Sequence, residues 1–144
     1  MGQEYWVDDN TTTAASKAQR LYNIIVEFAI TDNGKHPHPK ICFKVVYTRL
    51  YLEIQRLTAT GHEICTIIPT EDQETPVSPD QILPWWIEIT TQDPPCVYYF
   101  GAFDSIGEAH LYERGYLEDL ILEQAQGITV YLKQCQPEVL TEEF

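Results

Sequence analysis

Cysteine and histidine are the first candidates for chemistry, because they ligate metals and act as nucleophiles or bases. The four cysteines lie far apart in the chain, at Cys42, Cys65, Cys96 and Cys135. Structural zinc sites usually pair cysteines two to four residues apart, and this chain has no such pair. The N-terminus also lacks the basic and apolar regions of an export signal, which makes disulfides unexpected. We therefore expect four reduced cysteines that fill the core.

His36 and His38 stand two residues apart in a proline-rich loop. Two imidazoles at this spacing could contribute to a metal site, but the sequence offers no third ligand beside them. His62 and His110 have no partnering motif either. We expect solvated loop histidines and no metal.

Paired carboxylates are the remaining candidates for acid–base catalysis, at Glu71-Asp72 and Glu118-Asp119. On so acidic a chain, solvated side chains are the better interpretation. A nucleophile elbow, a phosphate-binding glycine loop and a paired-histidine metal motif are all absent from the sequence. The sequence therefore predicts no catalytic residue and no cofactor.

The net charge of the 144 residues is −13, and it belongs to the second half. Residues 1–69 hold seven basic and seven acidic side chains. Residues 70–144 hold 15 acidic side chains against only Arg114 and Lys133. Nucleic acid is excluded as a partner, because phosphate contacts require Lys and Arg. We expect instead a protein partner with a basic patch, and self-association is compatible with this interpretation.

No apolar run approaches the length of about 20 residues that a membrane-spanning helix needs. We therefore expect a cytoplasmic protein without a membrane partner.

The second half predicts three strands by composition and alternation: Trp85–Thr91, Cys96–Phe100 and Ile128–Leu132. Ser105 followed by Glu108 is typical of a capping box at a helix start. We expect this helix to end near Gly115 and a second one to cover Tyr116–Gln126. The fold class is thus α+β, with a small antiparallel strand–strand–helix–helix–strand sheet in the C-terminal half.

The first half is expected to be rich in strands, with one helix and a loose start at residues 1–13. Apolar residues recur at helical spacing over Ala14–Phe28, although its β-branched end also suits a strand. The segment Leu50–Leu57 alternates like a strand, and a helix there is not excluded. We expect Ile41–Tyr47 and Glu63–Ile68 to be strands, the latter in a hairpin with Leu50–Leu57.

An acidic, proline-rich run separates the halves. Such a segment buries little apolar surface, which is typical of a linker. The predicted organisation is therefore a strand-rich segment at 1–68, a linker at 69–83 and an α+β domain at 84–144. No internal repeat is visible.

Alternation divides the side chains of the second half between two sheet faces. The apolar face should pack against the helices through a set that includes Trp85, Ile87, Ile89, Tyr98, Phe100, Ile128, Val130 and Leu132. The opposite face should present Trp86, Glu88, Tyr99 and Tyr131, a candidate interaction surface if the first half leaves it open.

A set of motifs in the second half resembles a cyanobacterial family, the domain of unknown function 1816. They are Pro84–Ile89, Tyr98–Ser105, Glu108-Ala109, Gly115–Leu120, Glu123–Ile128, Lys133–Pro137 and Leu140-Thr141. Ala102 stands where the family usually has proline, which the same turn accommodates. The resemblance implies a cyanobacterial origin and brings no catalytic residues, and it does not extend to the first 83 residues.

Two hypotheses for function follow. The first is a non-catalytic protein–protein interaction or regulatory module that uses the aromatic sheet face. The alternative is a small-ligand-binding protein or minor enzyme with a pocket between the halves, lined by Trp and Tyr.

Overall fold

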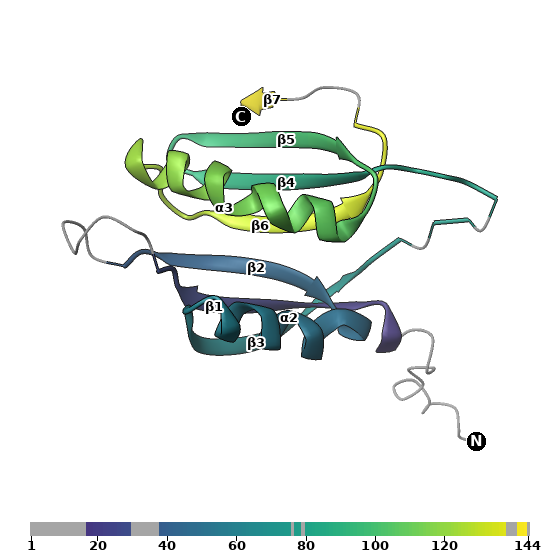
Figure 1. Cartoon of the computed structure of the whole chain (residues 1–144), viewed down its shortest axis with the longest axis horizontal. Coiled ribbons are helices and arrows are strands. Elements are labelled where there is room, and N and C mark those ends of the chain that lie inside the picture. The colour runs from purple at the N-terminus through teal and green to yellow at the C-terminus, as the bar shows by residue number, and fades with distance from the viewer. Residues whose placement is uncertain (1–16, 30–37, 76, 79, 138–140, 144) are drawn as a thin grey trace, which may run out of the picture.

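The computed structural model describes residues 17–29, 38–75, 77–78, 80–137 and 141–143. In order along the chain, its elements are β1 (Arg20–Glu27), β2 (Lys40–Val46), α2 (Tyr47–Ala59), β3 (Glu63–Gln73), β4 (Trp85–Gln92), β5 (Pro95–Phe103), α3 (Ile106–Leu122), β6 (Thr129–Gln134) and β7 (Thr141–Glu143). The seven strands form one sheet in the order β3-β1-β2-β6-β4-β5-β7. Figure 1 shows α2 and α3 lying on the same side of this sheet.

The expected fold class is therefore wrong. The sheet is not confined to the C-terminal half, because β2 pairs in parallel with β6 and joins both halves into one mixed sheet. The two predicted helices of the second half are also a single helix, α3, that continues through Gly115. A glycine inside a helix costs only about 1 kcal/mol, and packing of the apolar side of α3 outweighs this cost.

The first half differs more from expectation. Where a helix was expected, residues 20–27 form the strand β1, whose β-branched run Ile24-Ile25-Val26 fits a half-buried pleated surface. Residues 50–57 belong to α2 and do not form the expected strand, in line with the helical alternative. β3 pairs with β1 and not with a hairpin neighbour, and it extends to Gln73, into the expected linker. The expected loose start lies outside the described residues.

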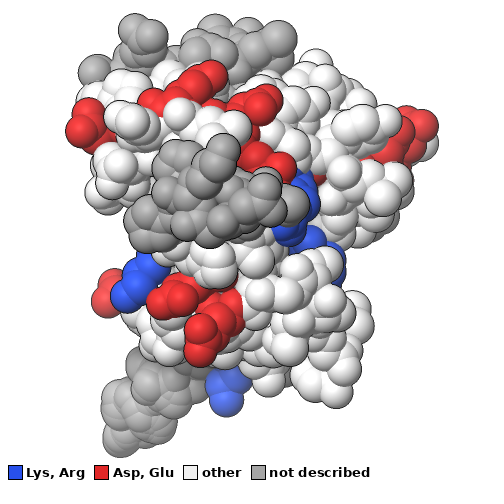
Figure 2. Space-filling view, turned by 60° about the vertical axis from the view of Figure 1, so that its left-hand side comes forward, with Lys and Arg blue, Asp and Glu red and all other residues white. Residues whose placement is uncertain are grey.

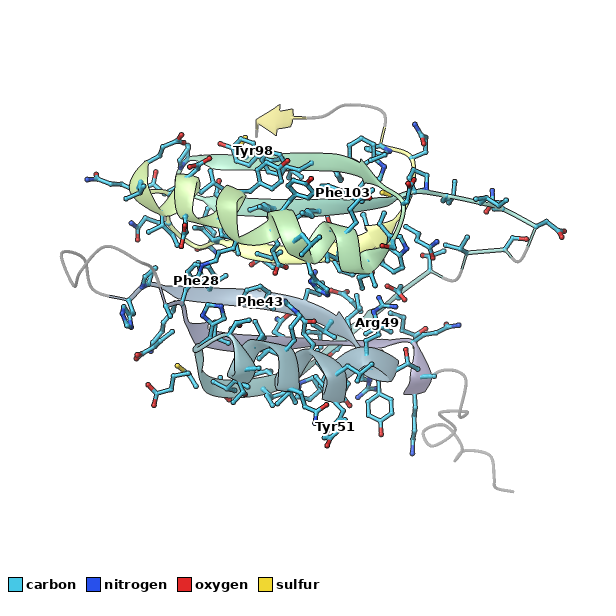
Figure 3. The ribbon with its side chains drawn as sticks, in the orientation of Figure 1. Phe28, Phe43, Arg49, Tyr51, Tyr98 and Phe103 are labelled. Atoms are coloured by element: carbon cyan, nitrogen blue, oxygen red, sulfur yellow. The ribbon has the colours of Figure 1, made fainter. Side chains whose placement is uncertain are left out.

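In the described part of the chain, a hydrophobic core fills the space between the sheet and the two helices. Phe43 lies within it, whereas Tyr51 on α2 points away from the molecule (Figure 3). The helix-facing set expected for the second half is confirmed: five residues are buried in this core, namely Ile87, Ile89, Ile128, Val130 and Leu132. Trp85, Tyr98 and Phe100 pack against it.

The two halves share one chain path, although their sequences show no repeat. Each runs strand, strand, helix, strand, and in each the first strand lies between the other two: β3-β1-β2 and β6-β4-β5. The shared pattern is a property of the topology, and it places the seam between the halves at β2 and β6.

Candidate binding site

The helix-free face of the sheet brings three of the four expected surface residues together. Glu88 on β4 pairs in register with Tyr99 on β5 and with Tyr131 on β6. Since in-register neighbours point to the same side of a sheet, the carboxylate lies between two tyrosine rings. All three side chains are half-buried.

Lys133 completes this group, which we call the aromatic face (Glu88, Tyr99, Tyr131 and Lys133). The Tyr99 hydroxyl donates to Glu88 Oε2 at 2.7 Å, and Lys133 Nζ lies 3.5 Å from Glu88 Oε1. The ammonium is also 5.9 Å from the Tyr99 ring centre and 5.5 Å from that of Tyr131. A cation within about 6 Å of an aromatic ring is attracted by its electron-rich face.

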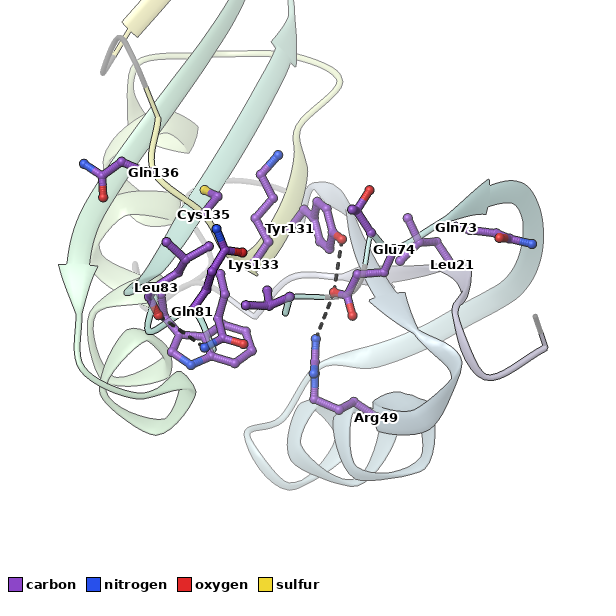
Figure 4. Close-up of a pocket in the computed structure, with 14 residues that line it drawn as sticks. Leu21, Arg49, Gln73, Glu74, Gln81, Leu83, Tyr131, Lys133, Cys135 and Gln136 are labelled. Atoms are coloured by element: carbon purple, nitrogen blue, oxygen red, sulfur yellow. Dashed lines mark hydrogen bonds and ion pairs between the residues drawn. The ribbon is translucent and has the colours of Figure 1, made fainter. Parts of the chain in front are cut away.

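The first half of the chain reaches the same tyrosine. Lys44 on β2 places its Nζ 5.8 Å from the centre of the Tyr131 ring. The Tyr131 hydroxyl donates to Glu74 Oε2 at 3.1 Å, and Arg49 Nη2 lies 3.3 Å from that oxygen (Figure 4). Tyr131 therefore binds groups from both halves across the seam.

Burial and the nearby Glu74 carboxylate raise the pKa of Tyr131 well above its ordinary value. The phenol therefore stays protonated at neutral pH and serves as a hydrogen-bond donor. This environment suits binding and disfavours a role for Tyr131 as a base.

A pocket of about 520 Å³ adjoins the aromatic face and shares Tyr131 and Lys133 with it (Figure 4). Its walls come from the end of β3 and the segment after it, the start of α2, the start of β4 and the end of β6. Arg49 holds its guanidinium 5.1 Å from the centre of the Trp85 ring at this pocket. The volume is within the range of small-ligand sites, about 300–1,000 Å³.

Trp86, the fourth expected residue, does not offer an accessible surface. Its side chain is only 8% exposed, and the position where Gly101 would carry a Cβ lies 2.8 Å from its ring. The indole nitrogen has no hydrogen-bond partner among the described residues. Trp86 therefore contributes to packing.

Several site residues were missed in the sequence, namely Lys44, Arg49, Glu74, Trp85 and Lys133. Lys133 could have been found, because it continues the alternation that includes Tyr131. The residues of the first half carry no such signal, since their proximity depends on the parallel pairing of β2 with β6.

Glu53, His110 and Glu113 form a group of possible metal ligands within the described residues, with their ligand atoms within 4.8 Å of one another. The group lies between α2 and α3, and Arg56 already occupies the place of a cation. Its Nη2 lies 3.0 Å from Glu113 Oε1, and its guanidinium also bonds Glu53. We interpret this group, with Arg56, as an ionic network that joins the two helices.

The thiols also differ from expectation in part. Cys96 is buried and Cys42 and Cys135 are half-buried, but Cys65 is exposed on β3. Burial raises the pKa of the Cys42 and Cys135 thiols, which disfavours the reactive thiolate. Of the expected loop histidines, His38 is exposed and His36 lies outside the described residues.

Figure 2 shows that the acidic side chains on this side of the molecule form several separate groups, with basic side chains between them. No helix in the described part of the chain is long and apolar enough to cross a membrane.

The family resemblance of the second half is confirmed by the comparison with known families. Residues 79–141 match the family model described as a domain of unknown function (DUF1816). This match contains β4, β5, α3 and β6, whereas β1, β2, α2 and β3 lie before it. No curated protein and no solved structure matches the chain.

Proposed function

We propose that the chain is a non-catalytic module that binds a partner protein through the aromatic face, which lies in the part that matches the domain of unknown function. The observation that carries this proposal is the convergence of Glu88, Tyr99, Tyr131 and Lys133 on the side of the sheet without helices. Half-buried tyrosines held by hydrogen bonds are rigid, and rigid aromatic side chains contribute most to interface cores. As the resemblance implies, this module would serve a cyanobacterial cell, in its cytoplasm.

The charges around the face refine the proposed partner. Lys44, Arg49 and Lys133 slightly outnumber Glu74 and Glu88, so the face itself is not acidic. We assign the contact there to aromatic and hydrogen-bonding groups of the partner. The basic patch that we expect on the partner would meet acidic groups elsewhere on the second half.

Quantitative affinity capture from a cyanobacterial lysate tests this function with matched variants. The Tyr99→Ala, Tyr131→Ala double variant removes the rings of the aromatic face. The control is Tyr51→Ala, Tyr112→Ala, which removes two exposed tyrosines (70% and 53%) from the helical side. We expect proteins captured by the natural chain to be lost with the first variant and kept with the second. Equal capture by all three folded chains contradicts the proposal.

The pocket supports a second candidate function, the binding of a small ligand. Trp85, Tyr131, Arg49 and Lys133 combine aromatic surface with a few converging polar groups, as ligand sites do. Gln81→Trp should fill the pocket and leave the aromatic face intact. A small molecule that shifts the Trp85 indole resonance in the natural chain and not in Gln81→Trp would support this function, and a screen without such a molecule would count against it.

A further inference from the structure

The strand pairings align the two halves of the molecule, β1 with β4, β2 with β5 and β3 with β6. This alignment relates the edges of the sheet to one another. Ile24 at the centre of β1 and Ile89 at the centre of β4 are both fully buried. On β2 and β5, their antiparallel partners are Phe43 and Tyr98. On β3 and β6, their partners are Ile67 and Val130.

This alignment makes the outer edge of β3 equivalent to that of β6, and the outer edge of β5 equivalent to that of β2. Within one molecule, the outer edge of β2 already pairs with the outer edge of β6. Residues 42–44 of β2 run parallel to residues 129–131 of β6. Their equivalents are residues 97–99 on β5 and residues 66–68 on β3.

The two equivalent segments differ in whether another strand covers their outer edge. On β3, residues 66–68 lie at the end of the sheet, where no other described strand pairs with them and Ile67 is 38% and Ile68 is 47% exposed. On β5, the outer edge is covered by β7, which pairs with Cys96, Val97 and Tyr98. The short strand β7 thus covers most of the segment that corresponds to the paired part of β2.

We propose that the β3 edge binds the β5 edge of a second copy of this chain, in the parallel register of β2 with β6, and that β7 caps β5 against it. Release of β7 from β5 is then the step that permits assembly. The contact is head-to-tail, so repetition builds a growing row of molecules rather than a closed dimer. The β5 edge shares only Tyr99 with the aromatic face. The inference rests on backbone pairing and does not depend on the proposed function.

The residues that flank the exposed part of β3 favour the β5 edge of a second copy over two alternatives, which are pairing of β3 with β3 and binding of nucleic acid. Pro69 lacks a donor for the ladder and Glu63, Glu71 and Asp72 are charged, so the usable window is short. Within one molecule, the β2–β6 seam joins the two halves through three residue pairs. Antiparallel pairing of β3 with itself about Ile67 and Ile68 would place Glu63 opposite Asp72, and like charges that face each other destabilise a sheet. β3 also contains no Lys or Arg that could contact the phosphates of nucleic acid.

Sedimentation velocity of a chain that ends at Pro137 tests the proposal, with the full chain as reference. We expect the full chain to remain monomeric and the shortened chain to rise with concentration to at least twice the monomer mass. Adding Ile67→Lys to the shortened chain should restore the monomer. The matched control Leu111→Lys, at a side chain of α3 that is 80% exposed, should not. Acidic residues flank the β3 edge, and Asp93 and Asp104 flank β5. Association should therefore strengthen between about 0.05 M and about 0.5 M salt, because salt screens the repulsion.

A folded, shortened chain that stays monomeric at all concentrations overturns the proposal. If shortening unfolds the protein, Thr141→Pro provides the same test, because it weakens the pairing of β7 with Tyr98 and keeps the rest of the chain.

Disulfide trapping then tests the register. In the proposed pairing, residue 66 of one copy lies beside residue 97 of the next, as Thr129 lies beside Cys42. In shortened chains that also carry Cys65→Ser, because that exposed thiol adjoins position 66, a mixture of Thr66→Cys and Val97→Cys should give the mixed disulfide. A preference for Thr66→Cys linked to itself would contradict the parallel register and indicate pairing of β3 with β3.

Discussion

The two halves of the molecule follow one chain path and use it differently. In the first half the outer strand β3 is long and exposed, whereas in the second half the strand β7 covers the outer edge of β5. Residues 1–69 are neutral, and the net charge lies in residues 70–144, which include the end of β3. The shared pattern therefore fixes where the seam and the edges lie, whereas local residues decide whether another strand pairs with each edge.

The helices show the same contrast. Ser105 caps α3: its hydroxyl accepts from the Glu108 amide at 3.1 Å, and the Glu108 carboxylate accepts from the Asp104 amide at 2.7 Å. The residue before α2 is Val46, which forms no side-chain cap. The start of α3 is therefore fixed locally, whereas α2 depends on packing through residues such as Leu57.

The network between α2 and α3 should give the largest effect, because it links the halves. Arg56→Met would leave the Glu113 carboxylate, 4% exposed, without its cation. Removing one partner of a buried ion pair costs about 3 kcal/mol or more. We expect this loss in the free energy of unfolding, measured with urea. In contrast, Arg49→Met breaks the half-exposed pair with Glu74 and should cost less than about 1 kcal/mol. Equal losses of unfolding free energy in Arg56→Met and Arg49→Met would show that the network between α2 and α3 does not join the halves.

His62 gives the first half a pH dependence that the equivalent turn of the second half lacks, since residues 123–128 contain no histidine. Burial, with Arg114 and Arg56 nearby, lowers the pKa of His62 to about 4, and its Nδ1 accepts from the Ala29 amide at 3.0 Å. The unfolded chain, with a histidine pKa of about 6.5, therefore binds the proton more readily.

The free energy of unfolding should then fall as the pH falls below about 6.5, by about 2 kcal/mol between pH 7 and pH 5. His62→Gln keeps an acceptor and removes the titration, so its urea midpoint should change less over this interval. The same loss in both proteins would assign the pH dependence to other groups.

The cap of α3 offers a smaller test of the contrast between the helices. Ser105→Ala should destabilise the protein by about 1 kcal/mol, because the Glu108 amide loses its acceptor. Thermal unfolding measures this directly, with Thr48→Ala at an exposed position in the first turn of α2 as the control. A null effect of Ser105→Ala would mean that packing alone positions α3, as it does α2.

Gly115 should give the smallest effect, and in the opposite direction. It lies inside α3, and a Cβ there would meet no atom within 4 Å. Gly115→Ala should therefore stabilise the protein by at most about 1 kcal/mol. A loss of stability would indicate that the helix is bent or interrupted there in solution.

The sequence predicts the second half better than the first, for physical reasons. β4, β5 and β6 alternate cleanly because one face is apolar, and Ser105 with Glu108 marks a helix start locally. In the first half, Ile24-Ile25-Val26 fits both a helical spacing and a strand, and tertiary pairing with β2 and β3 decides between them. The alternation of residues 50–57 was misleading, because Leu50, Ile54 and Leu57 also form the buried side of a helix.

The candidate site was predicted in part for the same reason. Glu88, Tyr99 and Tyr131 follow from alternation within neighbouring strands. Lys44, Arg49 and Glu74 come from the other half, and nothing local in the sequence specifies the parallel pairing that brings them to Tyr131.

The central claim is that the two halves form one sheet and build the site together across the β2–β6 seam. The amide of Cys42 donates to the Ile128 carbonyl at 3.0 Å at this seam. Hydrogen exchange followed by NMR tests it most directly. We expect the Cys42 amide to exchange as slowly as amides within the β1–β2 and β4–β5 ladders. Fast exchange at Cys42, with both ladders still protected, would contradict the claim and show two halves that each fold without the other.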